Sequence, residues 1–579
     1  MEAQPETLAI ASPHPLMKGR WYMYITQFVS GMSVMAVELG ASRLIAPYFS
    51  SSQIIWTIII GSIMIAMAIG NFLGGKLADK HPSIARLYFF MLLSGTWITL
   101  IPFLGRFVIA GITAFFAMFI NAGLLIWASF FTCFILFIPP LLLLGTVTPS
   151  LIKYAQTSGN TSGKVVGILE ALGTVGSILG TFLPTFLTIP TIGTAWTFLT
   201  FGVILFVLGL VYFLVDWIAR IRKQKAGKKV ETSPSEKKAQ KKDDIGKIVA
   251  CSLCLLGTIS GCFLNTQASF AFWDSKIKYT GESIYNYLQI REDGDTRYFS
   301  TNVMFSFQSV IKNKGEDLTG YYYDYAMAAP LMAENAKNKE LDVLVLGMAM
   351  GTYATQLQKF YPDYKLNITG VEIDEKMIAL AHDWFYLSPD IPVVAEDGRA
   401  YLRMADKTKK WDVMLLDAYS GISVPFQMAS KEFFELTAEH LNDGGVIVSN
   451  INMVDERPGS VDDALAETMK NVYPYVYSYT LGGGSTNREL FASKSSLMMS
   501  NLSSRMDSLV KTELKTPFNK VLKNSKEVTA KAICLTDDNA DVELRSMSAI
   551  DGIIAGELEQ YRAIFRQKGL WGLIQYLLS

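Results

Sequence analysis

The chain has 579 residues, of which half are hydrophobic, and its 52 Lys and Arg residues balance its 52 Asp and Glu residues. This length allows two or three domains, and the hydrophobic share indicates that part of the chain lies in a membrane. The chain has four histidines and five cysteines, and the Cys251/Cys254 pair has no second pair close by in sequence. The composition therefore argues against a metal site and against catalytic histidine chemistry. The sequence has no basic stretch with interleaved aromatic residues, which is the pattern that predicts nucleic-acid binding.

The charges are divided unevenly along the chain. Residues 1–217 hold nine Lys and Arg and six Asp and Glu, residues 218–247 hold eleven and four, and the remainder holds 32 and 42. The remainder is therefore acidic by ten charges (42 minus 32). An acidic domain suits a cationic substrate through electrostatic steering, and acidity is equally typical of a soluble surface.

Residues 1–217 predict a transmembrane helical domain of six spans. The first apolar run, residues 22–49, follows Lys18 and Arg20 and is too long for a removable signal peptide. The other long apolar runs are residues 54–78, 87–104, 122–148, 165–189 and 194–217. Residues 107–119 form a shorter apolar run, which we interpret as re-entrant or interfacial.

Several residues inside these runs indicate how the spans pack. Glu38 and Arg43 lie in apolar surroundings, where an unpaired charge costs at least ~2.5 kcal/mol, so we expect each to find a partner or an aqueous cavity. Gly167, Gly173, Gly176 and Gly180 supply small residues that allow helices to approach closely. Residues 74–80, Gly-Gly-Lys-Leu-Ala-Asp-Lys, resemble the short cytoplasmic loop of major-facilitator transporters.

The next two segments decide the side on which the soluble domain lies. Residues 218–247 are rich in Lys, Ser and Pro, which predicts a disordered basic linker, and residues 248–265 are apolar enough for a further span. With six spans, the basic segments share one side, which the positive-inside rule makes cytoplasmic. We therefore expect a multi-pass protein of the cell (inner) membrane with a cytoplasmic soluble domain. A crossing at 248–265 would reverse that side, and the sequence leaves this open.

Residues 275–330 predict a small β-domain, and residues 331–579 predict a Rossmann-like α/β domain. In the first, residues 282–291 and 298–307 alternate between apolar and polar side chains around the turn sequence Glu-Asp-Gly-Asp at 292–295. In the second, a β-type run at 342–346 leads directly into a turn bounded by Gly347 and Gly351, and a helix follows at about 352–360. Such a turn is typical of a strand that brings its backbone close to a ligand.

Three successive predicted strands of the α/β domain end in carboxylates. The second strand, residues 366–371, ends in Glu372, the third ends near Asp397, and the fourth, residues 411–416, ends in Asp417. Because parallel strands end at one edge of a sheet, these acids should lie along one crevice. Glu372 follows the glycine turn by about twenty residues, where an acid holds the ribose hydroxyls of a nucleoside. A helix at 431–441, strands at 444–450, 472–479 and 489–493, and a C-terminal helix from residue 550 complete the prediction.

At these residues the sequence resembles the spermidine synthase (polyamine aminopropyltransferase) family, and in particular its membrane-fused bacterial branch. The resemblance covers about residues 283–543 and implies that Gly347, Gly351 and Glu372 hold an S-adenosyl nucleoside and that Asp397 faces its adenine. It also implies that the co-substrate is decarboxylated S-adenosylmethionine, with no metal. Met348, Ala349 and Met350 are bulkier than the residues of the family's glycine-rich turn.

The resemblance also assigns the acceptor side of the site. Asp417 stands at the family's catalytic aspartate, and Ser420 replaces the second acid of that motif. Tyr322 and Asp324 stand in the segment that precedes the nucleotide-binding strand. From these positions we expect Asp417 to take the proton of the attacking amine, Tyr322 and Tyr419 to orient that amine, and Asp324 and Ser420 to contact the substrate. Residues 536–543, Thr-Asp-Asp-Asn-Ala-Asp-Val-Glu, resemble the acidic motif that closes the fused branch.

Three functions remain open at this point. The first is a membrane-tethered aminopropyltransferase with a small cationic amine as acceptor. The second is an S-adenosylmethionine-dependent methyltransferase, for which Arg399 is the nearby cation that could hold the methionine carboxylate. The third is a degenerate domain that senses a polyamine or nucleoside and controls a transporter-like membrane domain. Membrane lipid is an expected partner, nucleic acid is not, and a homo-oligomer is left open.

Overall fold

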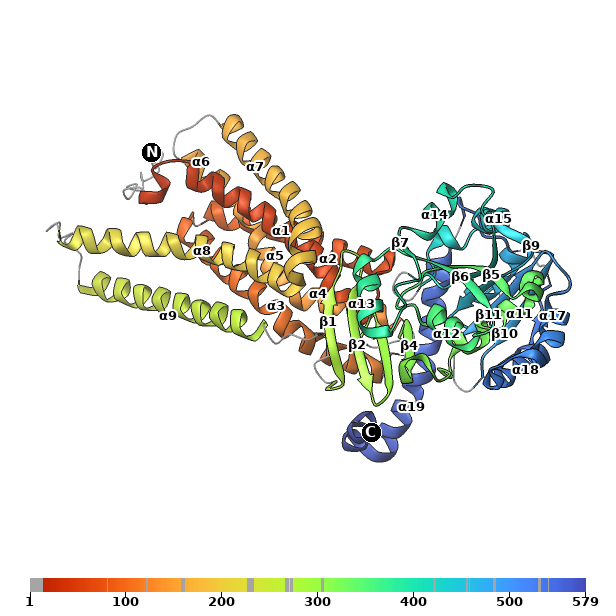
Figure 1. Ribbon diagram of the computed structural model, residues 1–579. Coiled ribbons are helices and arrows are strands. Elements are labelled where there is room, and N and C mark those ends of the chain that lie inside the picture. Colours follow the sequence, from red (N-terminus) through yellow and green to blue (C-terminus); the bar gives the residue numbers. More distant parts are fainter. Residues whose placement is uncertain are drawn as a thin grey trace. The chain divides into compact units, whose positions relative to one another are not determined.

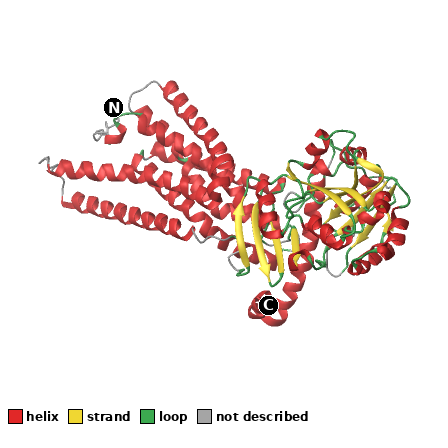
Figure 2. Ribbon diagram, viewed as in Figure 1, coloured by secondary structure: helices red, strands yellow, loops and turns green. Residues whose placement is uncertain are grey.

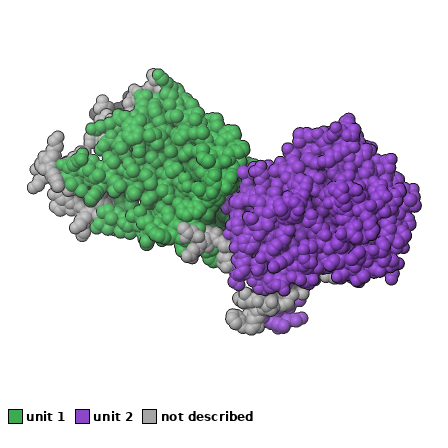
Figure 3. Space-filling view, in the orientation of Figure 1, with its two compact units in different colours: residues 1–45, 54–116, 126–272 green, residues 46–53, 117–125, 273–579 purple. Residues whose placement is uncertain are grey.

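The computed structural model describes residues 14–80, 82–120, 123–157, 162–225, 234–265, 270, 274–303, 307–419, 423–454, 457, 459–482, 486–529, 533–539 and 541–578. The chain forms two compact units, which Figure 3 colours separately. The helical unit comprises residues 1–45, 54–116 and 126–272, and the second unit comprises residues 46–53, 117–125 and 273–579. The second unit therefore includes two short segments, residues 46–53 and 117–125, from the N-terminal part of the chain.

The N-terminal part of the chain is helical (Figure 1). A short 3₁₀ helix, η1 (Pro15–Met17), precedes α1 (Trp21–Phe49), α2 (Gln53–Lys80), α3 (Ile84–Phe119), α4 (Leu124–Leu136), α5 (Ile138–Gly145), α6 (Val147–Thr157), α7 (Ser162–Leu183), the π-helical turn η2 (Pro184–Thr188), α8 (Ile189–Lys225) and α9 (Pro234–Asn265). Among the described residues, five helical segments are long and apolar enough to cross a membrane. Leu124–Leu136 and Ile138–Gln156, which meet at a bend of 48°, add a sixth if they count as one span.

Helix α3 differs from the sequence prediction, because it runs without a break through the segment expected to be re-entrant or interfacial. The apolar pattern is interrupted at Arg106, which made residues 107–119 look separate. In the structure the Arg106 guanidinium lies over the rings of Phe103 and Phe107, at 4.6 and 4.8 Å from their centroids. Aromatic faces attract a cation in this geometry, so the helix accommodates the charge and continues.

Gly176 and Gly180 of α7 have the packing role predicted for them, whereas a Cβ at Gly167 would meet no atom within 4 Å. A Cβ at Gly176 or Gly180 would collide with backbone carbonyls of α1, so only glycine allows this approach. Residues 218–225 continue α8 and residues 234–247 begin α9, where a disordered linker was expected. Lys, Gln, Glu and Ala are good helix formers, which accounts for this helix despite its polarity. Residues 226–233 of the linker lie outside the described residues.

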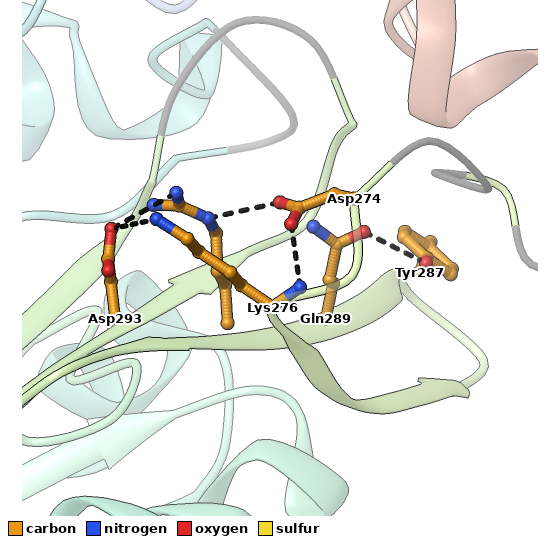
Figure 4. Close-up of polar contacts among 6 residues, drawn as sticks. Asp274, Lys276, Tyr287, Gln289 and Asp293 are labelled. Carbon is orange, nitrogen blue, oxygen red and sulfur yellow. Dashed lines mark hydrogen bonds and ion pairs between the residues drawn. The ribbon is translucent and has the colours of Figure 1, made fainter. Parts of the chain in front are cut away.

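The second unit contains a four-stranded antiparallel sheet in the order β1 (Ile277–Glu282), β2 (Tyr287–Asp293), β3 (Thr296–Ser300), β4 (Ser309–Lys312). The predicted hairpin is confirmed between β2 and β3, with Gly294 at a positive φ of 60° in the turn. Figure 4 shows the polar contacts on this sheet, where Asp293 accepts Lys276 at 2.8 Å and Asp274 accepts the Lys276 backbone N–H at 2.8 Å. These groups are largely exposed, so they add little stability.

The large sheet of the second unit confirms the predicted Rossmann-like α/β domain. Its eight strands lie in the order β12-β10-β11-β9-β8-β5-β6-β7. Their bounds are β5 (Glu340–Leu346), β6 (Lys365–Glu372), β7 (Val393–Ala395), β8 (Trp411–Leu416), β9 (Leu441–Ile451), β10 (Tyr475–Thr480), β11 (Arg488–Ser493) and β12 (Lys526–Glu527). Strands β5 to β9 pair in parallel, and β10, β11 and β12 are antiparallel.

Helices surround this sheet (Figure 2). They are η3 (Asn313–Gly315), α10 (Tyr322–Ala326), α11 (Ala329–Met332), η4 (Glu334–Asn338), α12 (Thr352–Phe360), α13 (Glu375–Phe385), α14 (Gly398–Met404), η5 (Phe426–Met428), α15 (Lys431–Glu439), α16 (Val461–Lys470), α17 (Met498–Arg505), η6 (Met506–Ser508), η7 (Thr512–Leu514), α18 (Lys515–Asn524) and α19 (Val542–Leu578). The interior strands β5, β8 and β9 have buried apolar residues at their centres, at 343–346, 413–416 and 446–448, as expected where both faces of a sheet are covered.

The strand order reverses direction at β5, because the next strand in the chain, β6, lies on one side of it and β8 lies on the other. In open sheets of this kind the crevice at such a point, beyond the carboxyl ends of the strands, is where ligands bind. Glu372 ends β6, and Asp417 follows β8 directly, with its backbone N–H bonded to the Leu346 carbonyl at 2.9 Å. The fold thus brings the predicted glycine turn and two of the predicted acids to one edge.

Candidate active site

The turn after β5 has the close backbone approach that its glycines predict. Gly347 has a φ of +79°, and a Cβ there would collide with the backbone of Asp417 and Ala418. Gly351, at +72°, is the residue before α12 and packs against Leu387, and it is not among the cavity-lining residues. A non-glycine residue would be strained at either position.

The methionines of this turn point away from the ligand space. Met348 packs against Gly370 and Met350 is completely buried, so both belong to the core. Gly347 and Ala349 line the cavity instead. The bulky residues that distinguish this turn from a glycine-rich one are therefore compatible with a nucleoside lying along its backbone.

Glu372 and Asp397 both line the cavity, and each is held by backbone donors of its own neighbourhood. Glu372 accepts the Ala349 N–H at 2.8 Å and the Asp374 N–H at 3.1 Å, and burial raises its pKa to about 7. Asp397 caps α14 by accepting the N–H groups of Arg399 and Ala400 at 3.0 and 2.9 Å. Backbone donors at a helix start fix a carboxylate without any long side chain.

Asp417 is held by side chains from two other elements. One carboxylate oxygen accepts the Asn450 amide of β9 at 2.9 Å, and the other accepts the Tyr322 hydroxyl of α10. Burial raises the pKa of Asp417 to about 7, while these two hydrogen bonds act in the opposite direction. Asn487 donates to the Asn450 side chain at 2.9 Å and keeps its amide aimed at Asp417.

The two predicted tyrosines have different surroundings. The ring of Tyr322 lies against that of Tyr323, with centroids 3.9 Å apart and planes tilted by 33°. Burial beside Asp417 raises the pKa of Tyr322, so it stays a hydroxyl donor. The Tyr419 hydroxyl donates to the Asn450 carbonyl at 2.7 Å and accepts the Asn452 N–H at 3.0 Å. Both tyrosines line the cavity. In the structure Tyr419 fixes the loop after β8, and Tyr322 contacts the acid itself.

Asp324, one of the two predicted substrate contacts, does not line the cavity. Asp324 is buried, and its carboxylate accepts Thr319 and Gly320 N–H groups at 3.0 and 2.7 Å, as well as the Thr319 hydroxyl at 2.8 Å. It therefore shapes the turn before α10, because both of its oxygens are engaged there. Ser420 lies outside the described residues.

The cavity that these residues enclose has a volume of about 790 Å³ and an unbalanced set of charges. Five carboxylates line it, namely Glu372, Glu396, Asp397, Asp417 and Glu543. Its described lining contains no Lys, Arg or His. Tyrosines, isoleucines and methionines supply the rest of a mixed apolar and polar wall. A cavity of this charge favours a cationic ligand and disfavours a free carboxylate.

Arg399, the predicted cation for a methionine carboxylate, is engaged elsewhere. Its guanidinium makes a bidentate pair with Asp537 at 2.7 and 2.6 Å, and it is largely buried. The Arg399 guanidinium also lowers the pKa of Asp537 to about 2. This pair ties the acidic motif after β12 to α14, and Arg399 is not among the residues that line the cavity.

Sequence reasoning missed Asn450, Asn487 and Glu489, which neighbour Asp417. Glu489 of β11 is completely buried and pairs in register with Asn450 of β9. Neither of its carboxylate oxygens has a hydrogen-bond partner in the described part of the chain. Burial, with a smaller contribution from the Asp417 charge, raises the pKa of Glu489 well above its ordinary value. An acid inside an otherwise apolar strand was the available signal in the sequence.

Comparison with known proteins agrees with this geometry. The family description "Spermine/spermidine synthase domain" matches residues 322–482. A probable polyamine aminopropyl transferase of Bifidobacterium longum (strain NCC 2705) is 42% identical over 350 residues, which are 57% of this chain and 75% of that protein. The polyamine aminopropyltransferase of Vibrio vulnificus (strain CMCP6) is 26% identical over 233 residues, which are 39% of this chain and 75% of that protein.

Among solved structures, a probable spermidine synthase from Corynebacterium glutamicum ATCC 13032 is 19% identical, with 45% of this chain and 98% of that chain covered and a TM-score of 0.33. Within the described residues, no group of three or more His, Cys, Asp and Glu side chains is arranged to hold a metal ion. The Bifidobacterium relative, matched over three quarters of its length, carries the assignment. The chain belongs to the spermidine/spermine synthase family of polyamine aminopropyltransferases.

Proposed function

We propose that this protein transfers the aminopropyl group of decarboxylated S-adenosylmethionine to a di- or polyamine, while its helical unit tethers it to a membrane. The observation that carries the proposal is the acidic cavity, whose described lining holds five carboxylates, Asp417 among them, and no basic side chain. Both co-substrates are cations, and the donor has lost the carboxylate that a basic residue would otherwise hold.

The turn after β5 and the acids Glu372 and Asp397 supply the nucleoside half of the cavity. Glu372 would accept hydrogen bonds from ribose hydroxyls, and Asp397 would face the base. The backbone at Gly347 and Ala349 lets the sulfonium end of the donor approach Asp417 closely. Arg399 is paired with Asp537, so an intact methionine carboxylate would find no cation among the described lining residues, which disfavours methyl transfer from S-adenosylmethionine.

The transfer itself is a displacement at carbon. The unprotonated acceptor nitrogen attacks the propyl carbon bonded to sulfur, a carbon–nitrogen bond forms as the carbon–sulfur bond breaks, and the electron pair of that bond stays on sulfur to give the neutral thioether. Asp417 receives the proton that the nitrogen loses. Tyr322 and Asn450 hold the two Asp417 oxygens, so the carboxylate presents a fixed geometry to the amine. The buried acid, with a pKa of about 7, can both take and release a proton near neutral pH.

The test uses the full chain purified in detergent, with decarboxylated S-adenosylmethionine and a panel of amines. We expect formation of the aminopropylated amine and methylthioadenosine in equal amounts. Calorimetry should also show tighter binding of the decarboxylated donor than of intact S-adenosylmethionine. If the protein binds both ligands without turnover, it is a sensing domain, and methyl transfer to an amine would contradict the proposal directly.

Membrane tethering is supported by the length and apolar character of the helices. The segment Gly163–Arg222 has 60 residues, which is about 90 Å of helix, and a bilayer core is only about 30 Å thick. The backbone leaves the helical region at Gly193, so this segment divides into two crossings. The soluble unit is cytoplasmic, as we expect, if the number of crossings is even. If α9 and the bent pair each count as one crossing, the number of crossings is odd. An odd number places the soluble unit on the side of the membrane opposite the cytoplasm.

Cysteine labelling in intact cells decides between these two sides. A single cysteine introduced at the exposed residue Leu497 of the soluble unit and one introduced at Lys18 would be tested with a membrane-impermeant maleimide. Protection of both sites would support the cytoplasmic proposal. Labelling at Leu497 together with protection at Lys18 would show that α9 crosses. Extraction of the protein by alkaline carbonate instead of detergent would contradict tethering itself.

A further inference from the structure

We propose that Glu543 is the second acid of the acceptor site and binds the far ammonium group of a di- or polyamine whose reacting nitrogen lies at Asp417. This inference rests on the proposed function and adds to it a residue that sets acceptor selectivity. A diamine at neutral pH carries two positive charges, and Asp417 interacts only with the nitrogen at the reacting end. A second carboxylate in the same cavity is therefore needed to hold the other.

The other cavity carboxylates are already committed. Glu372, Glu396 and Asp397 accept backbone N–H groups of the turns on the nucleoside side, at 2.8 to 3.1 Å. Asp417 accepts the amide of Asn450 and the hydroxyl of Tyr322. The first three are thus positioned for the donor, and Asp417 is positioned for the reacting nitrogen.

Glu543 stands apart from them on the first turn of α19. Its carboxylate accepts one hydrogen bond within the described part of the chain, from the Gln53 N–H at a long 3.4 Å, and the side chain is only partly buried. Its oxygens are therefore available to an ammonium group that enters the cavity. A charged hydrogen bond to a carboxylate is shorter and stronger than this backbone contact.

The same wall fits the methylene chain between two ammonium groups. Ile550 and Ile554 follow Glu543 by seven and eleven residues, which places all three on one face of α19, and both isoleucines line the cavity. Ile553 and Ser51 complete the wall on this side. At 1.5 Å per residue, Glu543 and Ile550 lie about 10 Å apart along the helix. A diamine with its far ammonium group at Glu543 would therefore lay its alkyl chain along Ile550 and Ile554.

This wall lies outside the part of the chain that matches the family description, which ends at residue 482. It is built from α19 and from the segment Ala46–Gln53 between α1 and α2, which belongs to the same compact unit. The Val303 N–H bonds to the Pro47 carbonyl at 2.9 Å and secures that segment to the small sheet domain. Acceptor selectivity is thus set by α19 and residues 46–53, and residues within 322–482 supply the chemistry.

The experiment compares two acceptors that differ in one charge, 1,4-diaminobutane and butylamine, with the full-length protein in detergent. Glu543→Gln should lower kcat/KM for the diamine by about 10–100-fold and leave kcat/KM for the monoamine within about twofold, because only the diamine has a far ammonium group. Glu543→Asp should recover part of the loss. Glu513→Gln, the same change at an exposed position that does not line the cavity, is the matched control and should alter neither value.

Equal losses for both amines, or no loss for the diamine, would overturn the role of Glu543. Absence of transfer to every amine by the wild-type protein would instead contradict the proposed function. In that case calorimetric titration with 1,4-diaminobutane decides the subsite separately. Weaker binding to Glu543→Gln than to wild type and Glu513→Gln supports the subsite, and equal binding excludes it.

Discussion

The two halves of the cavity are constructed in different ways. On the nucleoside side, Glu372 and Asp397 are held by N–H groups within about 25 residues of themselves in the chain. On the acceptor side, Asp417 is held by Tyr322 and Asn450, which are 95 and 33 residues away. The first half is built from local turns, whereas the second exists only when α10, β8 and β9 are packed together. Substitutions on the two sides should therefore separate ligand binding from chemistry.

The largest effect is expected at Asp417. Asp417→Asn keeps the size of the side chain and removes the proton acceptor, so kcat should fall by about 10²–10⁴-fold. Binding of the donor nucleoside, measured by calorimetry, should stay nearly unchanged because it depends on the other half of the cavity. Turnover within about threefold of wild type would remove Asp417 from the mechanism.

Glu372→Gln should show the opposite pattern. The variant loses the carboxylate that we propose faces the ribose, so the Kd of the donor should rise by about 10–100-fold, while kcat at saturating donor changes by less than about threefold. Titration calorimetry and initial rates at several donor concentrations separate the two quantities. A fall in kcat with an unchanged Kd would show that the halves are not independent.

Asn450→Ala tests the acceptor side of the cavity through the pKa of Asp417. The Asn450 amide stabilises the charged form of Asp417, so its loss should raise the pKa of Asp417 further above about 7. The acid limb of the pH profile of kcat should move to higher pH, and kcat should fall by about tenfold at pH 7 and by more at pH 6. Asn442→Ala, at a distant amide that binds Asp412 at 2.7 Å, is the matched control. A proportional loss at every pH would indicate a structural role only.

Glu489→Gln should have the smallest effect on rate and a measurable one on stability. The pKa of Glu489 is raised in the folded protein, so the unfolded chain ionises first and wild-type stability falls as pH rises above about 4.5. Gln does not ionise, so the variant should melt a few degrees higher than wild type at pH 8, with a smaller difference at pH 5. Glu513→Gln should show no such dependence. A Tm difference that is constant with pH would contradict the raised pKa of Glu489.

The sequence alone determined the features that depend on neighbouring residues. The run at 342–346, the glycines at its end and the acids after three strands were readable because strand periodicity and turn chemistry act over a few residues. The hairpin around Gly294 and the long apolar helices of the N-terminal part were readable for the same reason. Even so, the pattern misled at Arg106, where ring contacts from Phe103 and Phe107 let α3 continue.

Tertiary structure decided the acceptor half of the site. Asp324 looked like a substrate contact by its place in the chain, but packing turned its carboxylate toward Thr319 and Gly320. Asn450 carries no signal of its own, because an amide in a strand is common, and the acidic motif at 536–543 does not indicate that Glu543 lines the cavity. Both residues gain a role when a sheet pairs β8 with β9 and when α19 returns to the cavity. Contacts between residues far apart in the chain depend on the whole fold, and the spacing of residue types records only the local part of it.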